Sequence, residues 1–228
     1  MFIDIRGYNK NIWRLNMLEE RISIQNPTLL HIYDGNTISY GANQIWYTKK
    51  WQTMAGCGPT TTSNLFWYLA KSRPEVCGNL YTIVNNDRTE MLELMEQVWE
   101  YVKPGMKGVN KSSMLKEGAI QYGRDKNVAL DVRVLEVPEE ISNRASENDV
   151  LKFLSIAFSE DLPVAFLNLS NGALENLDNW HWVTLISTDI ELQAEMYDQS
   201  IRQIIDVKKW LKTTTKGGAF VVVVPMIQ

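Results

Sequence analysis

The stretch WQTMAGCGPTTTSNLFWYLA, Trp51–Ala70, joins a glycine turn to the start of a helix. Cys57 lies in the turn Gly56-Cys57-Gly58, and Pro59 opens a run with apolar residues at helical spacing. Proline is tolerated in a first helical turn, because its missing N–H would have had no partner there. The sequence therefore predicts Cys57 at or just before a helix N-terminus, where unpaired N–H groups and the helix dipole favour a thiolate.

The two histidines differ in their settings. His31 lies inside a strand-like run, whereas His181 opens the strand pattern NWHWVTLI after a loop. A nucleophilic thiolate needs a base within about 2.6–3.2 Å. His181 is the better candidate, because a strand is a rigid mount and the preceding loop leaves one end open. We interpret His31 as a half-buried histidine without a catalytic role.

An acidic residue follows the next strand pattern, Gln193–Tyr197. This strand can pair antiparallel with Trp182–Ser187 across a turn at Asp189, which would bring Asp198 back to the His181 end. Residues at matched offsets on antiparallel neighbours lie ~5 Å apart. Asp198 could then accept the ring N–H and fix the tautomer of His181. Asn179 is a rival polar partner, which we interpret as a loop residue.

An acyl transfer also needs donors for the developing oxyanion. The backbone N–H of Cys57 is one candidate. A side-chain amide shortly upstream is the second, and Gln52, five residues before Cys57, is the nearest. Gln44 lies further away along the chain.

Helical patterns come first along the chain and strand patterns later, which predicts an α+β fold. We expect one domain over residues 1–228, with a 1–50 N-terminal extension of short strands, a mainly helical lobe over 51–160 and a mainly antiparallel sheet over 161–228. The expected helices after the cysteine segment are Thr89–Val102, Ser112–Tyr122 and Asn148–Phe158. The expected strands are Leu29–Tyr33, Ile38–Tyr40, Val128–Val137, Pro163–Leu169, Trp180–Ser187, Gln193–Tyr197, Ile201–Ile205 and Ala219–Pro225.

Composition narrows the classes of function. The chain is 45% hydrophobic and 22% charged with a net charge of −4, which does not indicate nucleic-acid or anionic-membrane binding. It has no apolar run of 18 residues and its N-terminus lacks a signal-peptide layout, so we expect a cytoplasmic protein. The sequence has no CxxC or HxxxH spacing and no glycine-rich phosphate loop, so we expect no metal or cofactor. Cys77 is interpreted as structural.

The motifs together resemble the papain-like cysteine peptidases. The closest likeness is to the bacteriocin-processing, double-glycine-leader peptidase group and its free-standing bacterial relatives. GCGPTTT is similar to the nucleophile motif and HWVTLI to the histidine strand, so the resemblance covers Trp51–Ala70 and Asn179–Asp198. Two departures stand out: Gln52 is five residues before the cysteine where many of these enzymes use six, and Trp180 replaces a common glycine, which indicates a more crowded cleft.

The resemblance implies a papain-like fold with the nucleophile on a helical lobe and the histidine and aspartate on an antiparallel sheet. It assigns Cys57 as nucleophile, His181 as base, Asp198 as orienting residue and Gln52 as oxyanion donor. The implied activity is that of a cysteine peptidase or related amide-bond hydrolase, acting on a peptide or protein through an acyl-thioester without cofactor. Two alternatives stay open: a transglutaminase-like acyltransferase using the same site, and a catalytically silent peptide-binding module.

Overall fold

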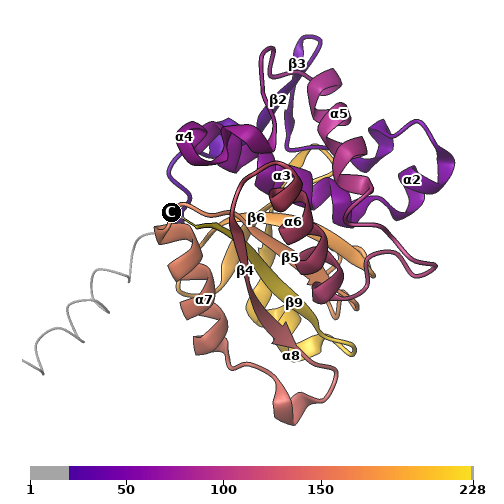
Figure 1. The fold of residues 1–228 in the computed structure, drawn as a ribbon. Coiled ribbons are helices and arrows are strands. Elements are labelled where there is room, and N and C mark those ends of the chain that lie inside the picture. The colour runs from indigo at the N-terminus through magenta and orange to yellow at the C-terminus, as the bar shows by residue number, and fades with distance from the viewer. Residues whose placement is uncertain (1–20, 227–228) are drawn as a thin grey trace, which may run out of the picture.

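A seven-stranded antiparallel sheet runs through residues 21–226, the part of the chain that the computed structural model describes (Figure 1). The strand order is β4-β9-β5-β6-β7-β8, and β1 pairs with a further stretch of β6. The strands are β1 (Ile22–Ser23), β4 (Leu130–Val137), β5 (Val164–Asn168), β6 (His181–Thr188), β7 (Gln193–Asp198), β8 (Ile201–Asp206) and β9 (Gly218–Pro225). A separate hairpin joins β2 (His31–Asp34) to β3 (Thr37–Tyr40).

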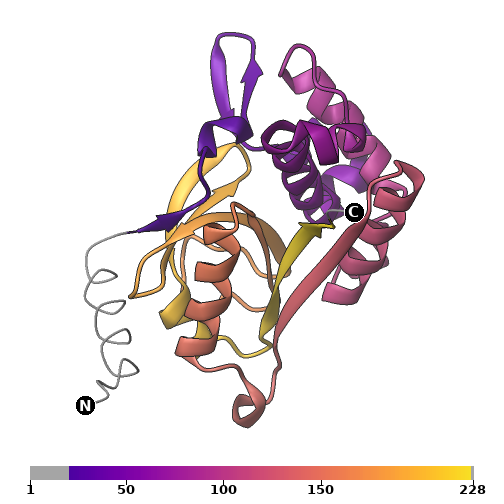
Figure 2. The ribbon, with the colours of Figure 1, turned by 60° about the vertical axis from the view of Figure 1, so that its left-hand side comes forward.

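The helices form two groups around this sheet (Figure 2). In one group, α3 packs on β5 and β6 and α6 packs on β4 and β9, while α5 lies against α3. In the other, α7 packs on β1 and β6, and α8 contacts β7. The helices are α2 (Lys50–Ala55), α3 (Cys57–Ser72), α4 (Pro74–Cys77), α5 (Arg88–Trp99), α6 (Ser112–Asp125), α7 (Glu147–Ser159) and α8 (Val207–Thr213), with short 3-10 turns between some of them.

Helix α3 is the buried centre of the molecule, and every residue from Gly58 to Ala70 is buried. Its first turns carry small polar residues, which let neighbouring elements approach closely. The hydroxyl of Thr62 donates to the carbonyl of Gly58 at 2.9 Å, and the hydroxyl of Ser63 donates to that of Pro59 at 2.8 Å. These bonds satisfy polar groups that would otherwise be costly to bury.

Local signals explain the ends of the outer helices. Asp87 caps α5 by accepting from the backbone N–H of Glu90, and Ser146 with Asp149 forms a capping box at the start of α7. Five of the strands expected after residue 160 lie where the sequence patterns predicted them. Mixed helices and an antiparallel sheet confirm the α+β class.

Two segments differ from expectation. The sheet includes β1 and β4, which lie in the regions expected to form an N-terminal extension and a helical lobe. Pairing of β4 with all eight residues of β9 explains this, because the four consecutive valines of β9 need an apolar strand beside them.

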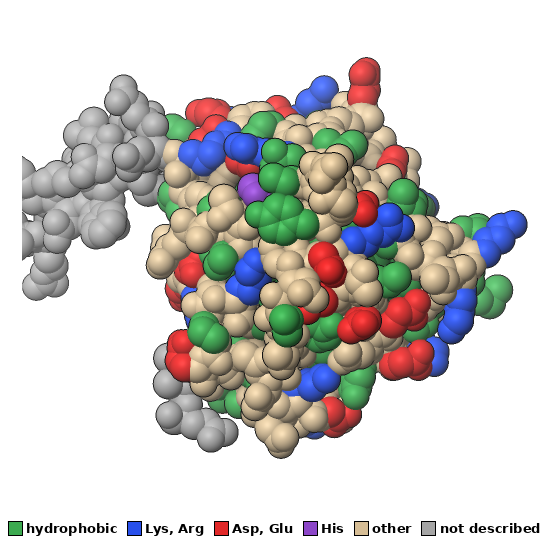
Figure 3. All heavy atoms as spheres, turned by 90° about the horizontal axis from the view of Figure 1, so that it is seen from above, with side chains coloured by type: hydrophobic (Ala, Val, Ile, Leu, Met, Phe, Trp, Pro, Cys, Tyr) green, Lys and Arg blue, Asp and Glu red, His purple; other side chains and the backbone are tan. Residues whose placement is uncertain are grey.

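The surface carries charges of both signs. On the face seen in Figure 3, Lys and Arg side chains and Asp and Glu side chains are both spread among hydrophobic ones. Within residues 21–226, no helix has the length and apolar character that a membrane crossing requires.

Candidate active site

Cys57 is the first residue of α3, as the glycine turn predicted. Both flanking glycines are required by close packing. A Cβ on Gly56 would lie 2.4 Å from the carbonyl oxygen of Gln52 and 2.7 Å from the ring of Tyr47, and a Cβ on Gly58 would lie 2.7 Å from the side chain of Val109. The helix can therefore start at this point only with glycine on each side of the cysteine. Cys57 itself is partly exposed.

His181 and Asp198 meet at the edge of the sheet where β6 begins and β7 ends. The Nε2 atom of His181 lies 2.8 Å from Oδ1 of Asp198. Thr184 pairs with Tyr197, so Asp198 is the next residue after the last β6–β7 pair and reaches back to the ring. With Nε2 bonded to the carboxylate, Nδ1 is the nitrogen left for a second partner.

The pKa of His181 results from opposing effects. Burial alone lowers it, because the charged ring loses its hydration. Hydrogen bonding to Asp198 and to Cys57, together with their negative charges, outweighs burial and raises the pKa to about 10. The imidazolium form is therefore favoured at neutral pH, with the Asp198 carboxylate as its hydrogen-bond acceptor.

A buried amide joins the helix of Cys57 to the strand of His181. Asn64, two turns along α3, donates from Nδ2 to Oγ1 of Thr184 at 3.0 Å. Its Oδ1 accepts from the backbone N–H of Ala42 at 2.8 Å. Asn64 is 3% exposed, so both bonds are shielded from water. This connection links the helix that begins at Cys57 to the strand that begins at His181.

Cys57, His181 and Asp198 line one narrow crevice, which we call the Cys57 crevice. Gln44 lines it too, as the first residue of the 3-10 turn Gln44–Trp46. The Nε2 atom of Gln44 donates to the carbonyl of Thr53 at 3.1 Å, which leaves its second amide hydrogen for another acceptor. Gln44 thus brings a side-chain amide to the crevice that Cys57 lines, although Cys57 comes thirteen residues later in the sequence.

Gln52 does not line the Cys57 crevice. It is 2% exposed, and its Nε2 donates to Oε2 of Glu96 on α5 at 2.6 Å. The role of Gln52 as an oxyanion donor stays a prediction. In the structure its amide donates to a side chain of α5.

The other three candidates from the sequence, His31, Cys77 and Asn179, have contacts or burial that indicate structural roles. His31 stacks near Tyr197, and its pKa is lowered by burial and by the positive charges of Arg202 and Lys71. Cys77 is fully buried, and burial raises the pKa of its thiol to about 11. Asn179, the rival partner for His181, instead accepts at Oδ1 from the backbone N–H of Asn171 at 2.8 Å.

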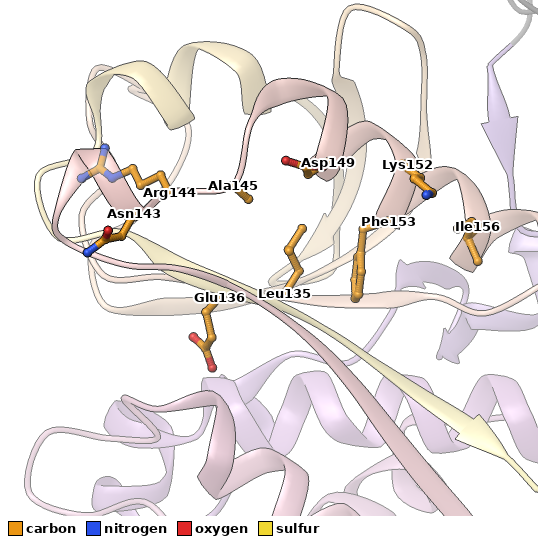
Figure 4. A pocket seen from close by; sticks show the side chains of 9 residues that line it. All are labelled: Leu135, Glu136, Asn143, Arg144, Ala145, Asp149, Lys152, Phe153 and Ile156. Carbon is orange, nitrogen blue, oxygen red and sulfur yellow. The ribbon is translucent and has the colours of Figure 1, made fainter.

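Cys57 also lines a second space, which we call the apolar pocket. This pocket has a volume of about 380 Å³ and is bounded by Trp51, Met54, Ala55, Cys57, Met106, Lys107, Gly108 and Trp180. A separate cavity of about 520 Å³ lies between β4 and α7 and shares no lining residue with either space (Figure 4). There Leu135 faces Phe153 across the gap.

The positions of two residues, Gln44 and Trp180, could not be predicted from the sequence. The sequence ranks Gln44 below Gln52 because Gln44 is further from Cys57 in the chain. No local pattern around Asn43 and Gln44 indicates that the fold brings Gln44 to the crevice. Trp180 was expected within the histidine strand, but it precedes the strand with a φ of 56° and borders the apolar pocket. A left-handed backbone at a tryptophan is not readable from the sequence pattern.

No family model matches the chain, and no curated protein matches it. Among solved structures, the chain is similar to a double glycine motif protease from an AMS/PCAT transporter, which was crystallised in complex with the leader peptide. The two are 14% identical, with 86% of this chain and 98% of that chain covered and a TM-score of 0.44.

Proposed function

We propose that this chain is a papain-like cysteine peptidase or a related amide-bond hydrolase. The observation that carries the proposal is the arrangement of Cys57, His181 and Asp198 in one crevice, with the thiol at a helix start and the ring 2.8 Å from the carboxylate. In this view the whole chain is one catalytic unit. The helical part supplies the nucleophile, and the antiparallel sheet supplies the base and the orienting residue.

The reaction follows from the site. The Cys57 thiolate attacks the scissile carbonyl carbon of a peptide or protein and forms a new S–C bond. His181, as imidazolium, gives its proton to the leaving nitrogen as the C–N bond breaks. Water then adds to the thioester, with His181 taking its proton, and the acid leaves as the Cys57 sulfur is released. Asp198 holds the ring in the tautomer that serves both steps.

The oxyanion would accept two hydrogen bonds. One donor is the backbone N–H of Cys57, which lies in the first turn of α3 and has no partner within the helix. The other is the amide of Gln44, which lines the crevice beside the thiol. Preorganised donors of this kind contribute strongly to acyl transfer. Gln44 therefore takes the role that the sequence assigned to Gln52.

The two alternatives make different demands on this site. A transglutaminase-like acyltransferase would use the same thioester and differ only in the acceptor, an amine in place of water. A silent binding module would need neither an ionised thiol nor a paired imidazole. The raised pKa of His181 and its contact with Asp198 favour a working site over a silent one.

Thiol alkylation tests the proposal without knowledge of the substrate. Iodoacetamide is added at pH 6, where a free thiol with a pKa of about 8.5 is less than ~1% ionised. We expect Cys57 to react at least ~10-fold faster than N-acetylcysteine, with the site identified by peptide mapping. His181→Ala should remove this advantage. Buried Cys77 is the internal control and should remain unmodified in the folded protein. Alkylation of Cys57 no faster than that of N-acetylcysteine would refute the proposed activity.

A further inference from the structure

Exposed hydrophobic side chains gather around the sulfur of Cys57. Of the apolar pocket's lining, Trp51 is 47% exposed, Met54 65%, Met106 99% and Trp180 42%. Large apolar side chains so exposed on a folded protein mark surfaces that receive a ligand or partner. Because Cys57 is itself part of the wall, anything bound covalently to the sulfur lies beside this pocket.

The walls of the pocket are held by specific bonds. Gly105 and Gly108 exchange two backbone hydrogen bonds, of 3.1 and 3.0 Å, and so form a tight turn that projects Met106 and Lys107. The loop is anchored to β6, because the indole nitrogen of Trp182 donates to the carbonyl of Val109 at 2.5 Å. The pocket is therefore built from fixed elements rather than from loose surface side chains.

The opposite wall is also fixed. Trp180 has a left-handed backbone, with φ of 56°, immediately before His181. The ammonium of Lys216 lies 4.5 Å from the centre of its ring, within the range of a cation–π contact. This contact leaves the tryptophan partly exposed and lining the pocket.

We propose that the apolar pocket binds a large apolar side chain on the acyl side of the scissile bond. The proposal rests on the proposed function above. His181 must protonate the leaving nitrogen, and it lines the Cys57 crevice but not the apolar pocket. The leaving group therefore lies on the His181 side of the sulfur, and the acyl group, bonded to the sulfur, lies on the side of the pocket. The substrate class is a peptide with a leucine-sized or aromatic residue at its acyl position.

The positive charge near the pocket narrows the class of substrate side chains further. Among the described residues that line the pocket, Lys107 carries the charge, and Lys216 lies against the ring of Trp180. A lysine or arginine side chain entering this pocket would meet like charge and lose water at apolar walls. Basic residues at the acyl position should therefore be rejected, and apolar ones preferred.

Four peptidyl fluoromethyl ketones test the proposal. The reagents are acetyl-alanyl-Xaa-CH₂F with Xaa as glycine, leucine, phenylalanine or lysine, so only the acyl-position side chain differs. The thiolate displaces fluoride: an S–C bond forms, the C–F bond breaks and fluoride leaves. We measure the rate of labelling of Cys57 by mass spectrometry and divide it by the iodoacetamide rate of the same protein. This division removes differences in the reactivity of the thiol.

We expect leucine and phenylalanine reagents to label ~10–100-fold faster than the glycine reagent, the size expected for burying such a side chain. The lysine reagent should be no faster than glycine. Trp180→Ala and Met54→Ala each remove part of a wall and should reduce the leucine-to-glycine ratio by ~5-fold or more. Ile141→Ala is the matched control, because Ile141 is 74% exposed but lies outside the pocket. It should leave the ratio unchanged.

The outcomes separate the two proposals. Equal labelling by the glycine and leucine reagents, fast labelling by the lysine reagent, or a ratio that both wall variants leave intact overturns the pocket assignment while the peptidase proposal stands. Failure of every reagent together with slow iodoacetamide alkylation of Cys57 overturns the proposed function, and the pocket assignment with it. Failure of every reagent with fast alkylation overturns the pocket assignment alone.

Discussion

Asn64 donates from its side-chain nitrogen to the hydroxyl of Thr184 across 3.0 Å, and both residues are buried. This bond joins α3, which begins at Cys57, to β6, which begins at His181. Cys57 and His181, the proposed nucleophile and base, lie on elements that are 120 residues apart at this contact, so their spacing depends on how helix and strand are held together. A buried hydrogen bond is well suited to this, because its geometry tolerates little change.

Asn64→Ala should lower the free energy of unfolding by about 2–4 kcal/mol. The change removes bonds to Thr184 and to the N–H of Ala42 and leaves those groups buried without partners. Urea denaturation measures the effect. Asn36→Ala, at the exposed turn between β2 and β3, is the matched control and should stay within about 0.5 kcal/mol of the wild type. An equally small effect at Asn64 would show that the contact does not hold the two elements together.

Alanine substitutions at Gln44 and at Gln52 should have different effects on catalysis and stability. Gln44→Ala should lower kcat by ~10²–10³-fold through loss of an oxyanion donor, measured on a peptide coumarin amide with leucine at the acyl position. Gln52→Ala should change kcat by less than ~3-fold. It should instead lower the free energy of unfolding by about 1–3 kcal/mol, because Glu96 loses its partner. The reverse ranking in kcat would restore the role that sequence spacing assigned to Gln52.

These two glutamines show where sequence reasoning succeeds and where it stops. The glycine turn, the helix start at Cys57 and the His181 strand all follow from local rules about backbone shape, and the structure has them. The direction of an amide does not follow from its distance along the chain. The amide of Gln52 donates to Glu96, which comes 44 residues later in the chain, and no local sequence pattern predicts that contact.

The sheet gives a second example. Antiparallel pairing of β6 with β7 could be predicted from two strand patterns and a turn, and it brings Asp198 to His181. The register shift between Leu185 and Ser187 could not be predicted. A bulge adds one residue to a strand, and the sequence on either side of it still reads as a regular strand. The place of β4 beside β9 was also beyond the pattern, since their pairing depends on tertiary packing rather than on neighbouring sequence.

Asp198→Asn should shift the alkaline limit of hydrolysis to lower pH. The folded-state pKa of His181 is raised to about 10, from an ordinary 6.5, in part by the carboxylate. Leaving-group protonation needs imidazolium, so wild-type kcat/KM should fall as pH rises through the region near 10. Without the negative charge of Asp198 the imidazolium is less stable, and the fall should come at least one pH unit earlier.

The same variant should lower kcat near neutral pH by ~10²-fold or more, as expected when a general acid–base loses its orienting partner. Asp125→Asn, on the exposed part of α6, controls for loss of one negative charge and should leave the pH profile in place. A purely structural role for Asp198 would reduce the amplitude of the profile without moving its alkaline limb.

Gly58→Ala tests the packing that places Cys57. The new Cβ would lie 2.7 Å from Cβ and Cγ2 of Val109, so the loop that carries Val109 must move. We expect a loss of about 1–3 kcal/mol in the free energy of unfolding, the usual cost of overpacking. Gly78→Ala is the matched control, because a Cβ there meets nothing within 4 Å, and it should be neutral or stabilising by up to about 1 kcal/mol.

A compensating change makes the Gly58 prediction specific. Val109→Ala removes Cγ1 and Cγ2, two of the three Val109 atoms that the new methyl group would meet. Gly58→Ala combined with Val109→Ala should therefore be more stable than the sum of the two single effects, by about 1 kcal/mol. Urea denaturation of the four proteins in this cycle gives the coupling free energy. The double variant should also recover part of the alkylation rate of Cys57 that Gly58→Ala loses, because the helix start returns to its place. Additive effects would mean that Gly58 is needed for backbone freedom in the turn and not for its contact with Val109.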